Sequence, residues 1–186
     1  IKEYLDEIEK LNKRYKNLEI LKGIEFSEPH LFLKEFQKYQ KLPLDYILVG
    51  IHHCNDEVFP GSANISEEQA IIEYYNMMVA TIESCDFQTL AHLDFPKRYF
   101  DHWNVKKAVI DNILKLIIQR KIALEVNTST VNISSTESMP SVEIVKRYVE
   151  LGGTMVTLGS DAHKCSDLAN GFKEVIRQLP KGVSVG

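Results

Sequence analysis

Apolar residues recur along this chain with two different periods. Spacings of three and four predict amphipathic helices, and short runs rich in Val, Ile and Leu predict strands. Helices are expected at residues 3–18, 31–40, 66–84, 104–120, 140–152 and 167–179. Strands are expected at residues 20–26, 46–52, 89–92, 122–127 and 154–160. This alternation predicts an α/β fold with a parallel sheet, either closed as a barrel or open and doubly wound.

Local signals support these boundaries. Ser66 and Gln69 have the spacing of a capping box, which satisfies free amides at the start of a helix. Pro140 is expected in the first turn of a helix that ends at Gly152. The glycine-rich motifs GxGxxG and GxxxxGK[ST], which hold nucleotide phosphates, are absent from the sequence. Their absence favours a barrel.

Composition narrows the class of protein. The 186 residues are 44% hydrophobic and 26% charged, which predicts one globular domain. A formal net charge of −4 argues against a nucleic-acid surface. The apolar runs are too short to cross a bilayer, and the charged, amphipathic start does not resemble a signal peptide. Three scattered cysteines without a CxxC spacing predict reduced, mostly buried thiols and a cytoplasmic location.

Every predicted strand ends in residues that can bind a metal. In chain order these are Glu25, His52 and His53, His92 and Asp94, Glu125 and Asn127, and Asp161 and His163. The carboxyl ends of parallel strands lie at one face, where sites are built. Oxygen and nitrogen ligands together suit zinc, manganese or iron. Each position also has a structural alternative, since a buried carboxylate can pair with a lysine or accept hydrogen bonds from loop amides.

Five stretches carry a resemblance to a known family. They are Gly23–Glu25, Asp45–His53, His92–Asp94 with Lys97–Tyr99, Leu124–Ser129 and Gly159–His163. In this order they resemble the polymerase-and-histidinol-phosphatase (PHP) superfamily, and within it the histidinol-phosphatase branch. The resemblance implies a distorted, TIM-like (β/α)7 barrel, of which about five βα units are present here. It also implies a cluster of up to three divalent metal ions: zinc, manganese or iron.

The resemblance also implies roles for individual residues. Glu25 is expected to bridge the first two metals, and His52 and His92 to bind the second. Asp161 is expected to bind the first metal and His163 the third.

The remaining roles concern the substrate. Arg98 is expected to bind its phosphate, since a planar guanidinium suits that group. Asn127 and Ser160 are expected to orient ligands and bind substrate. Asp161 and Arg98 are the predicted catalytic residues, with Asp161 or a neighbouring acid passing a proton to the leaving group.

The chain also departs from the family pattern. It begins in the helix before the third family strand, so residues 1–186 are expected to form one PHP phosphoesterase domain that lacks the first two βα units and their His-x-His ligands. We therefore expect weak activity or none from these residues alone. Where the family often has Gly-x-Arg, this chain has Thr130-Val131-Asn132, so a second phosphate-binding arginine is absent.

The function expected from this resemblance is hydrolysis of L-histidinol phosphate to L-histidinol and phosphate, a step of histidine biosynthesis. One alternative is another sugar or nucleotide phosphate, or a nucleic-acid end. Another is an inactive fragment or interaction module. The expected partner is a small phosphorylated molecule rather than a membrane or a nucleic acid. A homo-oligomer, or pairing with the missing N-terminal part, stays open.

Overall fold

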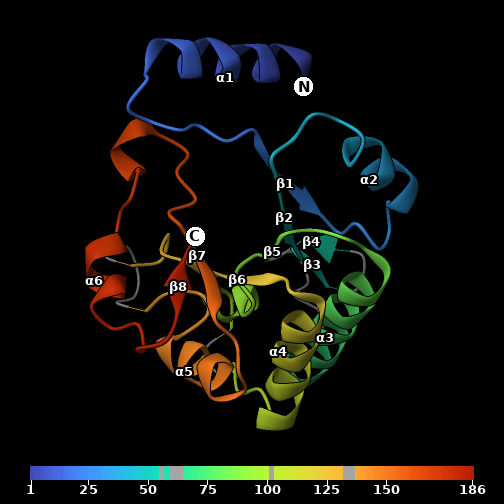
Figure 1. Ribbon diagram of the computed structural model, residues 1–186. Helices are drawn as coiled ribbons and strands as arrows, with labels where there is room; N and C mark the ends of the chain where they lie inside the picture. The colour runs from blue at the N-terminus through green and yellow to red at the C-terminus, as the bar shows by residue number, and fades with distance from the viewer. Residues whose placement is uncertain (55–56, 59–64, 101–102, 132–136) are drawn as a thin grey trace.

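A six-stranded parallel sheet organises the chain in the computed structural model (Figure 1), which describes residues 1–54, 57–58, 65–100, 103–131 and 137–186. Its strands lie in the order β1 (Gly23–Ser27), β2 (Tyr46–Gly50), β5 (Thr89–Leu90), β6 (Ala123–Asn127), β7 (Met155–Gly159) and β8 (Ser184–Val185). All neighbours in this order pair in parallel. The predicted α/β fold is therefore confirmed, although β1 and β8 remain separate edges and the sheet is not closed.

Helices connect the successive parallel strands. They are α2 (Leu33–Tyr39), α3 (Glu67–Ser84), α4 (Lys107–Arg120), α5 (Val142–Glu150) and α6 (Phe172–Ile176). Two short 3-10 helices, η1 (Phe95–Arg98) and η2 (Cys165–Asp167), follow β5 and β7, and β3 (His53–Cys54) pairs antiparallel with β4 (Glu57–Val58). Helix α1 (Lys2–Arg14) runs across the top of Figure 1, apart from α3, α4 and α5 at the bottom.

The core lies between the sheet and helices α3 and α4. All five residues of β6 are buried, as expected of a strand in the interior of a parallel sheet. Tyr74, Met78 and Ile82 bury one face of α3, and Ile113 and Ile117 bury one face of α4. This packing fixes the strand ends on which the polar residues lie.

Several predicted boundaries shift at the N-terminal end. The helix expected to reach residue 18 ends at Arg14, because Tyr15 and Leu18 are 46% and 60% exposed and contribute little to packing. The Asn12 side chain then bonds both the N–H and the C=O of Ile20, which turns the chain toward β1. The predicted loop at residues 54–65 contains the short β3–β4 pair, and most of it lies outside the described residues.

The C-terminal third shows further corrections. Pro140 precedes α5 instead of occupying its first turn, because the hydroxyl of Ser141 caps the helix by accepting from the amide of Ile144. The helix expected at 167–179 is divided into η2 and α6, and Gly171, at φ +74, separates them. Strand β8 was not predicted, since Ser184 and Val185 are exposed and show no apolar run.

The structure bears on two predictions from composition, one on membrane-spanning helices and one on buried cysteines. None of the helices in the described ranges is long and apolar enough to cross a bilayer. Cys85 is buried and free, as expected, whereas Cys165 is exposed. That residues 1–186 form one domain stays a prediction.

Candidate metal centre

Three of the predicted ligands meet at the carboxyl ends of β1, β2 and β5. Glu25 lies in β1, His52 follows β2 by two residues, and His92 follows β5 by two residues. Glu25 Oε1 is 3.2 Å from His92 Nε2 and 3.5 Å from His52 Nε2. The two imidazole rings meet edge to face, with their centroids 4.8 Å apart. One ligand atom from each residue lies within 4.8 Å of the others, the spacing of a set that can surround one ion.

Gly50, at the end of β2, leaves the room in which these side chains converge. A Cβ at this position would lie 2.6 Å from Glu25 Oε1, 2.6 Å from His52 Cε1 and 3.1 Å from His92 Cε1. Real Cβ atoms essentially never lie within 3.0 Å of another heavy atom, so any side chain here would displace Glu25 and His52 and crowd His92. Gly50 is therefore required because the Glu25, His52 and His92 side chains approach its Cα too closely for any side chain.

The exchange Gly50→Ala is expected to lower the affinity for a divalent metal by about 10- to 100-fold, the cost typical of losing a residue that orients a ligand. Isothermal titration of zinc into metal-free protein measures this change. Gly23→Ala is the matched control, since a Cβ at Gly23 in β1 meets its nearest atoms at an ordinary 3.6 Å. Equal zinc affinities for the two variants would contradict the crowding argument.

Glu28 lies beside two adjacent histidines at the end of β2, with its Oε1 3.8 Å from His52 Nδ1. Its carboxylate is buried, and its Oε1 accepts hydrogen bonds from the backbone amides of His52 and His53. Glu28 Oε2 lies 3.4 Å from His53 Nδ1, whereas the Nε2 of His52 turns to Glu25. Burial raises the pKa of Glu28, and these amides and His53 act against that rise. This arrangement agrees with the choice of His52 over His53 as the candidate ligand.

The protonation of His52 suits metal binding. Burial, together with the nearby His92, lowers the pKa of His52 to about 4, so its ring is neutral at pH 7. Neutral imidazole is the form that binds a metal. Burial alone would raise the pKa of Glu25, but the hydrogen bond and charge of His92 lower it overall, which keeps this carboxylate ionised.

The second nitrogens of the two histidines differ. His52 Nδ1 lies 3.2 Å from Ser27 Oγ. His92 Nδ1 is buried and has no hydrogen-bond partner among the described residues. The His92 ring is held instead by packing, since the Phe95 ring lies 4.8 Å from it and 4.9 Å from His52. Burial acts to lower the pKa of His92, but the hydrogen bond with Glu25 and the charge of Glu125 raise it overall, so metal binding must displace any proton from this ring. Two imidazoles and one carboxylate fit a divalent transition metal with an open coordination position.

Two further strand-end residues support the loop rather than face the ligands. Glu125 is buried, and its Oε2 accepts from the amide of His92 at 2.9 Å, which is the loop-amide alternative considered for this position. Asn127 is also buried, and its amide bonds Glu125 and Ser129. A Cβ at Gly159 of β7 would lie 2.0 Å from Glu125 Oε1, so this glycine makes room for the carboxylate. Contact of Asn127 with a substrate stays a prediction.

Asp161 and His163 lie at the same edge of the sheet but outside the group of three. Asp161 follows β7 in the left-handed region at φ +50, and its side chain is 30% exposed. His163 Nδ1 lies 2.9 Å from the carbonyl oxygen of Asp161, and the His163 side chain is 83% exposed. The negative charge of Asp161 acts to raise the pKa values of His52 and His92, so this carboxyl group is close enough to interact with both rings. Ser160 is half-buried beside Asp161, and the predicted roles of all three stay predictions.

Arg98 is separated from the two candidate histidine ligands by the ring of Phe95, which contacts all three side chains. Its guanidinium carbon is 5.1 Å from the centroid of the Phe95 ring, and Nη2 donates to Ser129 Oγ at 3.1 Å. Arg98 itself is exposed, so most of its donors face the solvent. Of the three residues that replace the family's Gly-x-Arg, Thr130 and Val131 are buried and Asn132 lies outside the described residues.

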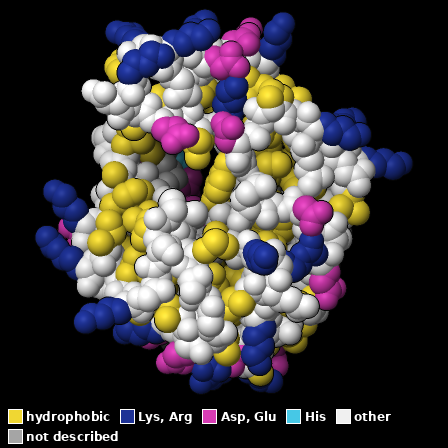
Figure 2. All heavy atoms as spheres, viewed as in Figure 1, with side chains coloured by type: hydrophobic (Ala, Val, Ile, Leu, Met, Phe, Trp, Pro, Cys, Tyr) yellow, Lys and Arg dark blue, Asp and Glu magenta, His cyan; other side chains and the backbone are white. Residues whose placement is uncertain are grey.

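Figure 2 shows a hollow on one face of the molecule, with acidic and histidine side chains visible inside it. A cavity of about 590 Å³ lies away from the three candidate ligands, lined by α4, α5 and the segment around Trp103. Size alone therefore does not identify the site.

Sequence reasoning missed Glu28, Gly50 and Phe95 as parts of this site. Glu28 lies three residues after Glu25 and directly before Pro29, and nothing in this local pattern signals its contact with the amides of His52 and His53. Gly50 directly precedes the Ile51-His52 pair, and a glycine at a strand end can mark a close approach. Phe95 gave no signal beyond its place between His92 and Arg98.

Comparison with known proteins places the chain in a family. The family model described as "PHP domain" matches residues 1–129. The chain is 34% identical over 138 residues to a probable histidinol-phosphatase of Thermotoga maritima, covering 74% of this chain and 56% of that protein. It is 31% identical over 192 residues to a probable histidinol-phosphatase of Clostridium acetobutylicum, covering 94% of this chain and 74% of that protein.

A solved structure shares the fold. The crystal structure of histidinol phosphate phosphatase from Lactococcus lactis, complexed with zinc, L-histidinol and phosphate, superposes with a TM-score of 0.76 at 20% identity. The match covers 98% of this chain and 74% of that one. This chain spans little more than half of the Thermotoga maritima relative, and the family match rests on the segment that carries Glu25, His52 and His92. The chain belongs to the PHP domain family.

Proposed function

We propose that the protein is a metal-dependent phosphatase that hydrolyses L-histidinol phosphate to L-histidinol and phosphate. The observation that carries this proposal is the convergence of Glu25, His52 and His92 on one point within the family's fold. Relatives named histidinol-phosphatase in three organisms support the choice of substrate. An oligomeric state and a cytoplasmic location stay predictions.

The metal would be held by residues already described. Glu25, His52 and His92 hold one divalent ion, and Asp161 and His163 contribute to further ions, up to three in all. Zinc, manganese and iron all suit these oxygen and nitrogen donors. When bound, such ions stabilise the negative charge that develops on phosphoryl oxygens, and hydrolysis of phosphate monoesters needs this because the uncatalysed reaction is very slow.

The chain's own side chains complete the site. The exposed N–H donors of Arg98 bind phosphate oxygens, with the guanidinium plane supported by the Phe95 ring. Asp161, or a neighbouring acid, accepts the proton that the attacking water loses and passes it to the leaving oxygen. Ser160 and Asn127 bind or orient the substrate from β7 and β6.

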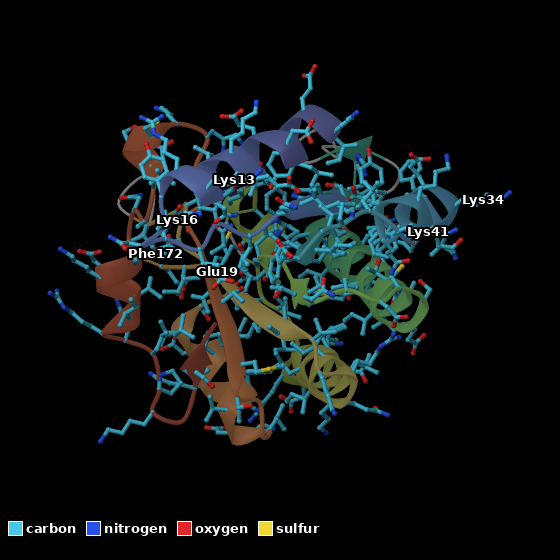
Figure 3. All side chains as sticks on the ribbon, turned by 45° about the horizontal axis from the view of Figure 1, so that its top comes forward. Lys13, Lys16, Glu19, Lys34, Lys41 and Phe172 are labelled. Atoms are coloured by element: carbon cyan, nitrogen blue, oxygen red, sulfur yellow. The ribbon has the colours of Figure 1, made fainter. Side chains whose placement is uncertain are left out.

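The distribution of positive charge supports a small substrate over a nucleic acid. Lys13 and Lys16 lie at and after the end of α1, while Lys34 and Lys41 lie on and after α2 and point outward (Figure 3). These two pairs of lysines lie apart in the view, whereas the footprint of a nucleic-acid site is a clustered basic patch or stripe. The net charge of −4 agrees with this reading.

An assay of phosphate release tests the proposal. Full-length protein is stripped of metal, reloaded with Zn²⁺ or Mn²⁺, and given L-histidinol phosphate, sugar phosphates, nucleotides and a 3′-phosphorylated oligonucleotide. We expect the highest kcat/KM with L-histidinol phosphate and loss of activity after chelation, restored by metal. Preference for another monoester would contradict the substrate, and no release from any of them would contradict the phosphatase function.

A further inference from the structure

The segment that follows β5 carries both a candidate metal ligand and the candidate phosphate-binding residue. His92 begins this segment and Arg98 ends η1 within it. The ring of Phe95 lies between the guanidinium and the two imidazoles. Arginine is a flexible side chain, and fixing it in one position costs rotamer entropy. Something beyond the short helix must therefore hold an exposed Arg98 in place.

Both ends of this segment are tied to the neighbouring strand. The amide of His92 donates to Glu125 Oε2 at 2.9 Å, and Arg98 Nη2 donates to Ser129 Oγ at 3.1 Å. Glu125 lies in β6, and Ser129 follows this strand by two residues. Both ends of the segment are therefore held by hydrogen bonds to the buried strand β6 or to the residues that follow it.

Asn127 links Glu125 and Ser129, the two residues that hold the ends of the segment. Its Oδ1 accepts from Ser129 Oγ at 2.7 Å and from the Ser129 amide at 3.0 Å, and its Nδ2 lies 3.4 Å from Glu125 Oε2. Asn127 is 2% exposed, and its backbone exchanges two hydrogen bonds with Met139. A continuous hydrogen-bonded chain therefore runs from His92 through Glu125, Asn127 and Ser129 to Arg98.

The direction of these bonds orients the serine oxygen. Because the Ser129 O–H donates to Asn127, the Ser129 oxygen is left with lone pairs that only accept. Arg98 has five N–H donors and no acceptor, so it is the matching partner. Ser129 takes one of these donors and leaves the others for an anion.

We propose that Ser129 is a positioning residue that holds the guanidinium of Arg98 for the substrate phosphate, with Asn127 fixing the serine hydroxyl. This inference rests on the proposed function, in which Arg98 binds that phosphate. It assigns to Asn127 a task that needs no contact with the substrate.

Substitution of Ser129 in the full-length, metal-loaded protein tests the proposal. We expect Ser129→Ala to raise the Kd for inorganic phosphate and the KM for the phosphomonoester by about 3- to 10-fold, the size of one hydrogen bond. Metal content and kcat should stay within about twofold, since no ligand is touched. Ser129→Thr keeps the hydroxyl and should restore the affinity. Ser84→Ala is the control, because the Ser84 hydroxyl bonds only within α3 and next to it.

The same exchange in an Arg98→Ala background separates positioning from a general structural effect. If Ser129 acts through Arg98, Ser129→Ala adds no further loss of phosphate affinity there. An equal loss in both backgrounds, a fall in metal content, or unchanged affinity in the first background would each overturn the proposal. If the wild-type protein releases no phosphate from any monoester, the proposed function fails, while the binding cycle with inorganic phosphate still tests the link between Ser129 and Arg98.

Discussion

Replacing His52 by alanine is expected to lower kcat/KM by more than about 100-fold, whereas replacing the adjacent His53 leaves most of the activity. Residues that merely orient a metal ligand already contribute about 10- to 100-fold, so loss of a ligand costs more. His52 Nε2 lies 3.5 Å from Glu25 Oε1, inside the group of three, while His53 Nδ1 faces Glu28. Two neighbouring histidines thus differ in what they can bind.

Metal content and activity are measured together for both variants, by plasma spectrometry and phosphate release. We expect His52→Ala to lose about one metal ion per chain and His53→Ala to keep its metal, with a stability cost of at most about 1 kcal/mol for the partly exposed pair with Glu28. A loss of metal from His53→Ala as large as that from His52→Ala would show that the pair acts as a unit. That result would contradict the assignment of His52 as the ligand.

The part of the site that depends only on the parallel sheet is predictable from the sequence. Alternating strands and helices place strand ends at one edge, and Glu25, His52 and His92 meet there as expected. Asp161 and His163 also follow a strand end and are expected at the same edge, yet they lie outside the group formed by Glu25, His52 and His92. Asp161 adopts a left-handed conformation at φ +50, and His163 points outward, which the period of a strand does not predict.

What the sequence does not predict depends on contacts between distant segments. Glu28 bonds the amides of His52 and His53, about 24 residues away, and no local pattern signals this. Strand β8 is two exposed residues whose pairing with β7 depends on the tertiary fold. Helix α6 is shorter than its apolar spacing suggests, since Gly171 at φ +74 interrupts the predicted helix.

The largest loss of stability is expected at Glu28. Its side chain is 1% exposed, and Glu28→Ala would remove the acceptor for two backbone amides and leave a cavity. Each unsatisfied buried donor costs about 1 to 3 kcal/mol, so we expect the two amides together to lower the free energy of unfolding by about 2 to 6 kcal/mol. Glu28→Gln keeps the volume and one acceptor oxygen and should cost about 1 kcal/mol or less.

Urea denaturation of the metal-free protein measures these free energies without a contribution from bound metal. Glu35→Ala is the matched control, since Glu35 also pairs with a cation, Lys38, but its side chain is 51% exposed and its loss should cost under about 0.5 kcal/mol. If Glu28→Ala unfolds with the same free energy as Glu35→Ala, the amides of His52 and His53 do not depend on Glu28. If it is destabilised as expected and also binds zinc more weakly, the buried carboxylate sets both the strand end and the direction of His52.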